Sequence, residues 1–160
     1  MRIFRQGLLE GRSIALAGAI ADPVKNALAA LGARVQRLDG PSAAAPLDAL
    51  VCAALPNEHL VGDALLEQEW AAVQAVASEL FIPARAGRII LIAPRRDAGT
   101  VKAGVENLAR TLSVEWARYG ITTTAITPGP KATDDQLAML VAYLCSPAGA
   151  YFSGCRFDLG

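Results

Sequence analysis

Residues 97–130, DAGTVKAGVENLARTLSVEWARYGITTTAITPGP, contain the pattern that decides the fold. At about 100° of rotation per residue, one stripe of this segment collects Val101, Val105, Leu108, Ala109, Leu112, Trp116 and Tyr119. Asp97 can cap the start of such a helix, and Gly120 stands where a left-handed residue commonly ends one. Residues 121–127 are rich in β-branched side chains, so we predict a helix over 97–119 and then a buried strand.

The opposite side of this helix is a mixed face of small and polar groups, with small or apolar side chains at Ala103, Val114 and Ala117. It carries Ala103, Asn107, Arg110, Val114 and Ala117. A helix face exposed to solvent normally carries mainly charged and polar groups. We therefore expect these five residues to form an interface with another subunit.

The beginning of the chain has the pattern of a β-α-β unit. Residues 13–17 form a short apolar run, typical of a buried strand. Asp22 and Pro23 have the order of an N-cap and a first helical residue, so a helix is predicted over 23–31. A second strand follows over 33–38.

The remaining segments complete an α/β pattern. Further strands are predicted over 47–54, 88–93 and 156–159, and further helices over 63–81 and 133–145, the last with a capping box. In the helix over 63–81, Trp70, Val73 and Val76 are predicted to face the sheet and Glu69 to lie outside this stripe. Pro83 is expected to end that helix. The prediction is one domain over residues 1–160, a three-layer αβα sandwich with a truncated Rossmann-like sheet of about six mostly parallel strands.

Three stretches of the sequence resemble the short-chain dehydrogenase/reductase family. They are GRIILIA at 87–93, the helix, strand and Pro-Gly turn within 101–130, and SPAGAYFSG at 146–154. The resemblance covers nearly the whole chain, with shorter loops where the family binds cofactor and substrate. It implies a Rossmann sheet and a dinucleotide-dependent oxidoreductase site.

The residues of that implied site are mostly replaced. At the positions where the family has its catalytic Asn, Ser and Tyr, this chain has Ala77, Pro94 and Ala98. In the family, the Ser hydroxyl polarises the substrate carbonyl and the Tyr phenol supplies the proton. Only Lys102 remains of the four groups, so we interpret it as vestigial and expect no catalytic residue.

The cofactor loop departs from the family pattern as well. The family has Thr-Gly-x-x-x-Gly-x-Gly, whereas here Gly18 is followed by no glycine until Gly32. Asp22 adds negative charge where a phosphate would lie, and Pro23 has no N–H to donate. Asp39 matches the family's ribose-binding acid. We interpret Gly18 and Asp39 as vestigial and expect the chain to bind no cofactor.

Composition limits the partners and the compartment. The 160 residues carry 15 basic and 15 acidic side chains, and this zero net charge gives no support for a nucleic-acid partner. The three cysteines lack metal-ligand spacing and fit a reducing cytoplasm, so we expect no metal site. No apolar run is long enough for a signal peptide or a membrane span, so a cytoplasmic protein is expected.

These observations favour a non-catalytic pseudoenzyme subunit. It would assemble with a complete NAD(P)-dependent short-chain dehydrogenase and stabilise it, as a heterotetramer formed through the helices over 63–81 and 97–119. The resemblance to heteromeric family members suggests a hydroxyacyl thioester as the substrate. Two alternatives stay open: an oxidoreductase with a relocated site that uses Lys102 with Asp97 or Asp39, and a homodimeric binding protein.

Overall fold

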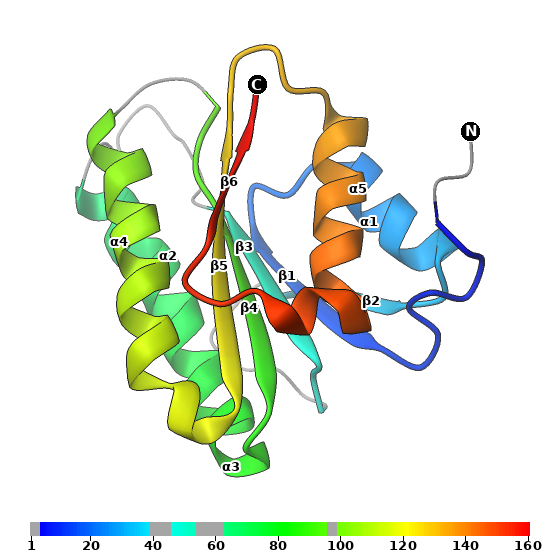
Figure 1. Ribbon diagram of the computed structural model, residues 1–160, viewed down its shortest axis with the longest axis horizontal. Coiled ribbons are helices and arrows are strands. Elements are labelled where there is room, and N and C mark those ends of the chain that lie inside the picture. Colours follow the sequence, from blue (N-terminus) through cyan, green and yellow to red (C-terminus); the bar gives the residue numbers. More distant parts are fainter. Residues whose placement is uncertain (1–3, 39–45, 54–62, 96–98) are drawn as a thin grey trace.

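The chain forms one six-stranded sheet, in the order β2-β1-β3-β4-β5-β6, in which every pair of neighbouring strands is parallel (Figure 1). This computed structural model describes residues 4–38, 46–53, 63–95 and 99–160. The strands are β1 (Ser13–Gly18), β2 (Arg34–Leu38), β3 (Ala49–Ala53), β4 (Gly87–Ile92), β5 (Ile121–Pro128) and β6 (Arg156–Leu159). The predicted α/β class and Rossmann-like sheet are confirmed.

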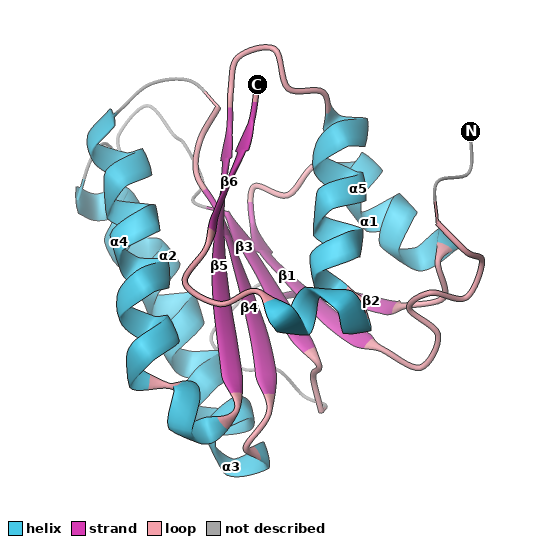
Figure 2. Ribbon diagram, viewed as in Figure 1, coloured by secondary structure: helices cyan, strands magenta, loops and turns pink. Residues whose placement is uncertain are grey.

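Helices cover both faces of the sheet, which gives three layers (Figures 1 and 2). Helices α2 (Asp63–Val76) and α4 (Gly99–Glu115) pack on one face, and α1 (Asp22–Ala30) and α5 (Asp134–Cys145) on the other. Every residue of β3 is buried, as a parallel strand between two helix layers requires. The apolar core is therefore divided by the sheet into two clusters.

Helix α1 begins one residue earlier than predicted. Its N-cap is Ala21, in an extended conformation and with no side-chain capping bond, and Asp22 lies in the first turn. The prediction of Asp22 as the N-cap was wrong, because Pro23 is tolerated at the second helical position as well as the first. Asp22 is instead placed at the positive end of the helix dipole.

The helix after β3 does not end at Pro83. After Val76 it continues as a π-helical turn (Ala77–Phe81) and then as α3 (Ile82–Ala84), which ends at Arg85 with φ of 52°. Pro83 lies in the first turn of α3, and its fixed φ near −65° is compatible with the helical conformation. The predicted stop is therefore displaced by about one turn.

Two other predicted helix signals are confirmed. The Thr133 side chain accepts the Gln136 backbone N–H at 3.1 Å, and the Gln136 side chain accepts that of Thr133 at 2.9 Å. Gly120 adopts the left-handed conformation after the last turn that follows α4. Asp97, the predicted cap of α4, lies outside the described residues.

Gly18 joins the ends of β1 and β3. It pairs with Ala53 in the parallel register, and the N–H of Ala19 donates to the Ala53 carbonyl at 3.1 Å. A Cβ atom on Gly18 would lie 1.7 Å from the Ala53 carbonyl oxygen, and the backbone φ is +77°. A side chain at this position is therefore excluded by contact as well as by conformation.

Gly18→Ala is expected to lower the free energy of unfolding by roughly 2–5 kcal/mol, from the left-handed conformation and the overpacked contact together. Gly11 is a matched control, because its φ is also +77° but nothing lies within 4 Å of its Cβ position. Gly11→Ala should lower the free energy of unfolding by only about 1–2 kcal/mol. Urea denaturation measures both losses, and equal losses would contradict the role of the Ala53 contact.

Candidate functional site

A pocket of about 420 Å³ opens at the carboxyl edge of the sheet. It lies beside the ends of β1 and β3, where the strand order reverses, which is where parallel α/β sheets bind ligands. The walls come from the turn after β1, the ends of β3, β4 and β5, and the first turn of α5. They are mainly apolar and include Ile20, Ala53, Ile92, Pro94, Pro128 and Leu137.

Arg95 and Asp134 are the charged residues among the described lining of this pocket, and they form an ion pair with each other. Arg95 also donates to the Ala132 carbonyl at 2.9 Å. The arginine therefore connects the end of β4 to the segment before α5. Because the two charges are opposite and paired, the described lining is electrically neutral.

Two N–H groups of the turn after β1 are already hydrogen-bonded within the protein. Ile20 N–H donates to the Gly18 carbonyl at 2.9 Å, and Ala19 N–H is bonded to β3. The Arg37 guanidinium lies against the carbonyl side of the turn and donates to the Ile20 carbonyl at 2.8 Å. It also lies 3.5 Å from the Asp22 carboxylate. Carbonyl oxygens and a carboxylate thus surround the Arg37 guanidinium.

These residues do not fit a dinucleotide. A pyrophosphate needs free backbone N–H groups at a helix N-terminus, whereas two N–H groups of this turn are occupied and Pro23 has none. The Asp22 carboxylate would repel a phosphate at the start of α1. Gly18 is accounted for by its contact with β3, and Asp39 lies outside the described residues.

Lys102 lies outside the described lining of the pocket. Its Nζ donates to the Pro128 carbonyl at 3.3 Å, which connects α4 to the Pro-Gly turn after β5. Pro94 lines the pocket, and Ala77 is buried in the π-helical turn. Ala98 lies outside the described residues. The four positions matched to the family site are therefore not shown to meet in one place.

Four of the five residues predicted to form an interface lie on the outer face of α4, and the fifth, Ala117, lies in the 3-10 turn that follows it. Ala103, Asn107, Arg110, Val114 and Ala117 are all exposed, and Val114 is 78% exposed. Among the described residues, no cluster of three or more His, Cys, Asp or Glu side chains could hold a metal ion. None of the described helices is long and apolar enough to cross a membrane.

Glu69 is a buried acid that the sequence analysis placed on the wrong side of α2. It is 1% exposed, and neither carboxylate oxygen has a hydrogen-bond partner of good geometry among the described residues. Burial raises the pKa of Glu69 to about 8, and the backbone of Ile92 offsets only part of this. Glu69 precedes Val73 by four residues and Val76 by seven, so helical spacing could have identified its buried position.

Cys52 on β3 lies against the same part of α2. Its thiol is 4.0 Å from the Glu69 carbonyl oxygen. Burial, and to a smaller extent the Glu69 charge, raise the pKa of the Cys52 thiol well above its ordinary value. Both groups are therefore held in their neutral forms at pH 7.

The buried acid predicts a pH-dependent stability. The folded pKa of about 8 exceeds the unfolded value of 4.5, so the Glu69 contribution is complete below pH 4.5 and is lost as pH rises toward 8. The free energy of unfolding should fall by about 1.4 kcal/mol per pH unit in that window, on the order of 5 kcal/mol in total.

Glu69→Gln should remove this slope and raise stability at pH 8, whereas Glu67→Gln, an exposed position on the same helix, should leave it unchanged. Urea denaturation from pH 4.5 to 8.5 measures the difference between each variant and the wild type. A wild-type slope retained in Glu69→Gln would show that another group titrates.

Comparison with known proteins gives relatives over parts of the chain. No protein-family model matches it. An uncharacterized oxidoreductase of Caenorhabditis elegans is 46% identical over 26% of this chain and 13% of that protein. A probable 2,4-dienoyl-CoA reductase of Bacillus subtilis is 35% identical over 36% of this chain and 34% of that protein. The chain thus spans no more than about a third of the length of these relatives.

Solved structures match over almost the whole chain. The citronellol catabolism dehydrogenase AtuB of Pseudomonas aeruginosa has a TM-score of 0.76 and 19% identity, covering 98% of this chain and 96% of that one. The structure of gox2181 has a TM-score of 0.72 and 18% identity, covering 96% of each chain. At these identities the likeness shows the fold.

The prediction that the chain is not an enzyme is contradicted by these comparisons. The relatives are named as an oxidoreductase and a reductase, and AtuB as a dehydrogenase. The replaced side chains at Ala77, Pro94 and Ala98 were too narrow a basis for that prediction, because the sheet edge and its pocket remain. The chain has the fold of the short-chain dehydrogenase/reductase family, and the resemblance in its motifs is confirmed.

Proposed function

We propose that this chain is a subunit of an oxidoreductase assembly, in which it packs against a complete NAD(P)-dependent short-chain dehydrogenase. The observation that carries the proposal is Val114, a large aliphatic side chain that is 78% exposed on the outer face of α4, where Ala103 is exposed as well. Asn107 and Arg110 share this face, and the exposed Ala117 follows in the short 3-10 turn after α4. Covering a large exposed aliphatic side chain with another protein surface removes it from water, which favours association.

Helix α2 widens this surface because it packs closely beside α4. A Cβ atom on Gly104 would lie 2.4 Å from the Leu66 side chain, so the glycine allows the two helices to approach. The Trp70 and Trp116 rings stack with centroids 6.1 Å apart. The outward residues Ala71 and Gln74 of α2 are exposed and uncharged. Two such helices from each subunit can form a four-helix contact of about 800 Å² per partner.

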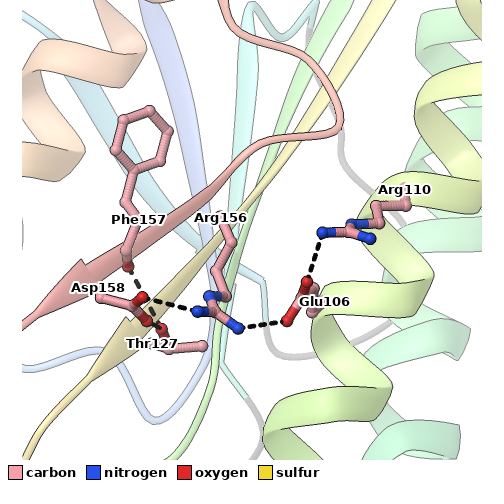
Figure 3. A network of polar contacts seen from close by, with 6 residues as sticks. All are labelled: Glu106, Arg110, Thr127, Arg156, Phe157 and Asp158. Carbon is pink, nitrogen blue, oxygen red and sulfur yellow. Dashed lines mark hydrogen bonds and ion pairs between the residues drawn. The ribbon is translucent and has the colours of Figure 1, made fainter.

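The last strand lies beside the same surface. Arg156 of β6 bonds Glu106 of α4 at 2.6 Å and Asp158 at 2.8 Å, and Glu106 bonds Arg110 at 2.7 Å (Figure 3). This network holds β6 against α4 from the outside. Since β6 is the last strand of the sheet that the described residues form, its outer edge can extend the contact. We propose a heterotetramer with two copies of each subunit.

The proposed substrate of the assembly is a hydroxyacyl thioester. Its support is the name of the Bacillus subtilis relative, a probable 2,4-dienoyl-CoA reductase. Purified assembly should therefore reduce or oxidise the nicotinamide cofactor with acyl-CoA substrates, with turnover measured by absorbance of the reduced cofactor. A panel of hydroxyacyl-CoA thioesters without any turnover would contradict this substrate class.

The assembly itself is tested by co-expressing the chain with a complete short-chain dehydrogenase encoded beside it. Size-exclusion chromatography with light scattering should show a complex of two copies of each. Val114→Arg or Ala103→Glu should split this complex without changing the circular dichroism of the chain, because each places a charge in the apolar contact.

Ala29→Glu is the matched control, since Ala29 is exposed on α1, on the other face of the sheet. It should leave the complex intact. A wild-type chain that elutes alone beside its candidate partner would overturn the proposal, and one that forms only homodimers would favour a self-associating protein instead.

A further inference from the structure

The geometry points to a ligand site for an uncharged, mainly aliphatic molecule in the pocket at the carboxyl edge of the sheet. The position is the one at which this fold would hold a dinucleotide, but the lining selects a different class of ligand. The inference concerns this chain alone and does not depend on the proposed assembly.

The walls of the pocket favour an aliphatic ligand. Ile20, Ile92 and Leu137 contribute branched apolar side chains from three different elements, and Ala53 and Pro128 add further carbon surface. Ile20 and Ile92 are almost fully buried. Side chains fixed in this way form a preformed apolar cavity, which binds by removing carbon surface from water.

The charges argue against an ionic ligand. Asp134 already pairs with Arg95, so an added anion would compete with an intramolecular carboxylate, and an added cation would compete with an intramolecular guanidinium. At the start of α1 the Asp22 carboxylate and the Ile20 carbonyl are directed at Arg37, which satisfies that cation as well. A neutral ligand disturbs neither pair.

One polar group can still orient the ligand. The Arg95 guanidinium has five N–H groups, and its contacts with the described residues, to Ala132 and Asp134, use two of them. A hydroxyl or carbonyl oxygen could accept another at the rim while the chain of the molecule occupies the apolar interior. A cavity of about 420 Å³ has room for roughly 10–15 non-hydrogen atoms.

The test uses 1-decanol, sodium decanoate and NADH as probes of the complete chain. Methyl ¹H–¹³C NMR spectra follow each titration, with decanol kept below its solubility limit. Decanol should shift the Ile20, Ile92 and Leu137 methyl signals and leave those of Val114 on the outer face of α4 unchanged. Decanoate should bind at least tenfold more weakly, and NADH should shift none of the three pocket residues.

Ala21→Leu should raise the dissociation constant for decanol at least tenfold, because Ala21 lines the pocket and its extended backbone accepts a larger side chain. Ala30→Leu adds the same side chain at an exposed position at the end of α1. It should change the dissociation constant for decanol less than twofold. If Ala21→Leu does not fold, Ala19→Leu at the exposed rim serves the same purpose.

Three results would overturn the inference. Micromolar NADH binding at the same methyl groups would identify a nucleotide site. Equal affinity for decanol and decanoate would contradict the selection for an uncharged ligand. Decanol that leaves the pocket methyl groups of the folded chain unchanged would show that the cavity takes no aliphatic molecule.

Discussion

The apolar surface of a parallel sheet has to be covered on both faces, and the rest of this structure depends on that requirement. Strand β3 is buried along its whole length, and Ile89 to Ile92 of β4 are buried in the same way. Helices α2 and α4 cover one side and α1 and α5 the other. A chain with shortened loops can therefore keep the complete sandwich, provided that each face retains its pair of helices.

The same requirement explains how much of the fold could be predicted from the sequence. Stripes at helical spacing and runs of β-branched residues report burial directly, so α4 and β5 were predicted nearly as the structure has them. Local sequence signals that fit two different backbone conformations predicted the helix boundaries less reliably. Pro23 fits either of the first two positions of a helix, and Pro83 can begin a helical turn as well as end one. The π-helical turn between α2 and α3 had no signal in the sequence pattern.

The candidate site was harder to predict because it is built from contacts between elements distant in the sequence. Motif spacing identified Lys102 and Pro94 but gave no indication that Lys102 bonds the Pro128 carbonyl. The pairing of Arg95 with Asp134 joins two elements that no local pattern connects. Glu69 was missed for a different reason: a charged residue was assigned to solvent by its type, although its spacing placed it among the buried positions.

The contact between Gly18 and the Ala53 carbonyl has a consequence for comparing relatives of this chain. The first glycine of a nucleotide-binding fingerprint is commonly scored as evidence of cofactor binding, yet here sheet packing alone excludes any larger residue. Selection for packing would preserve that glycine in a lineage that had lost the cofactor. In this chain, Gly18 therefore reports that two strands meet, and the later glycines of the fingerprint would carry the information about nucleotide binding.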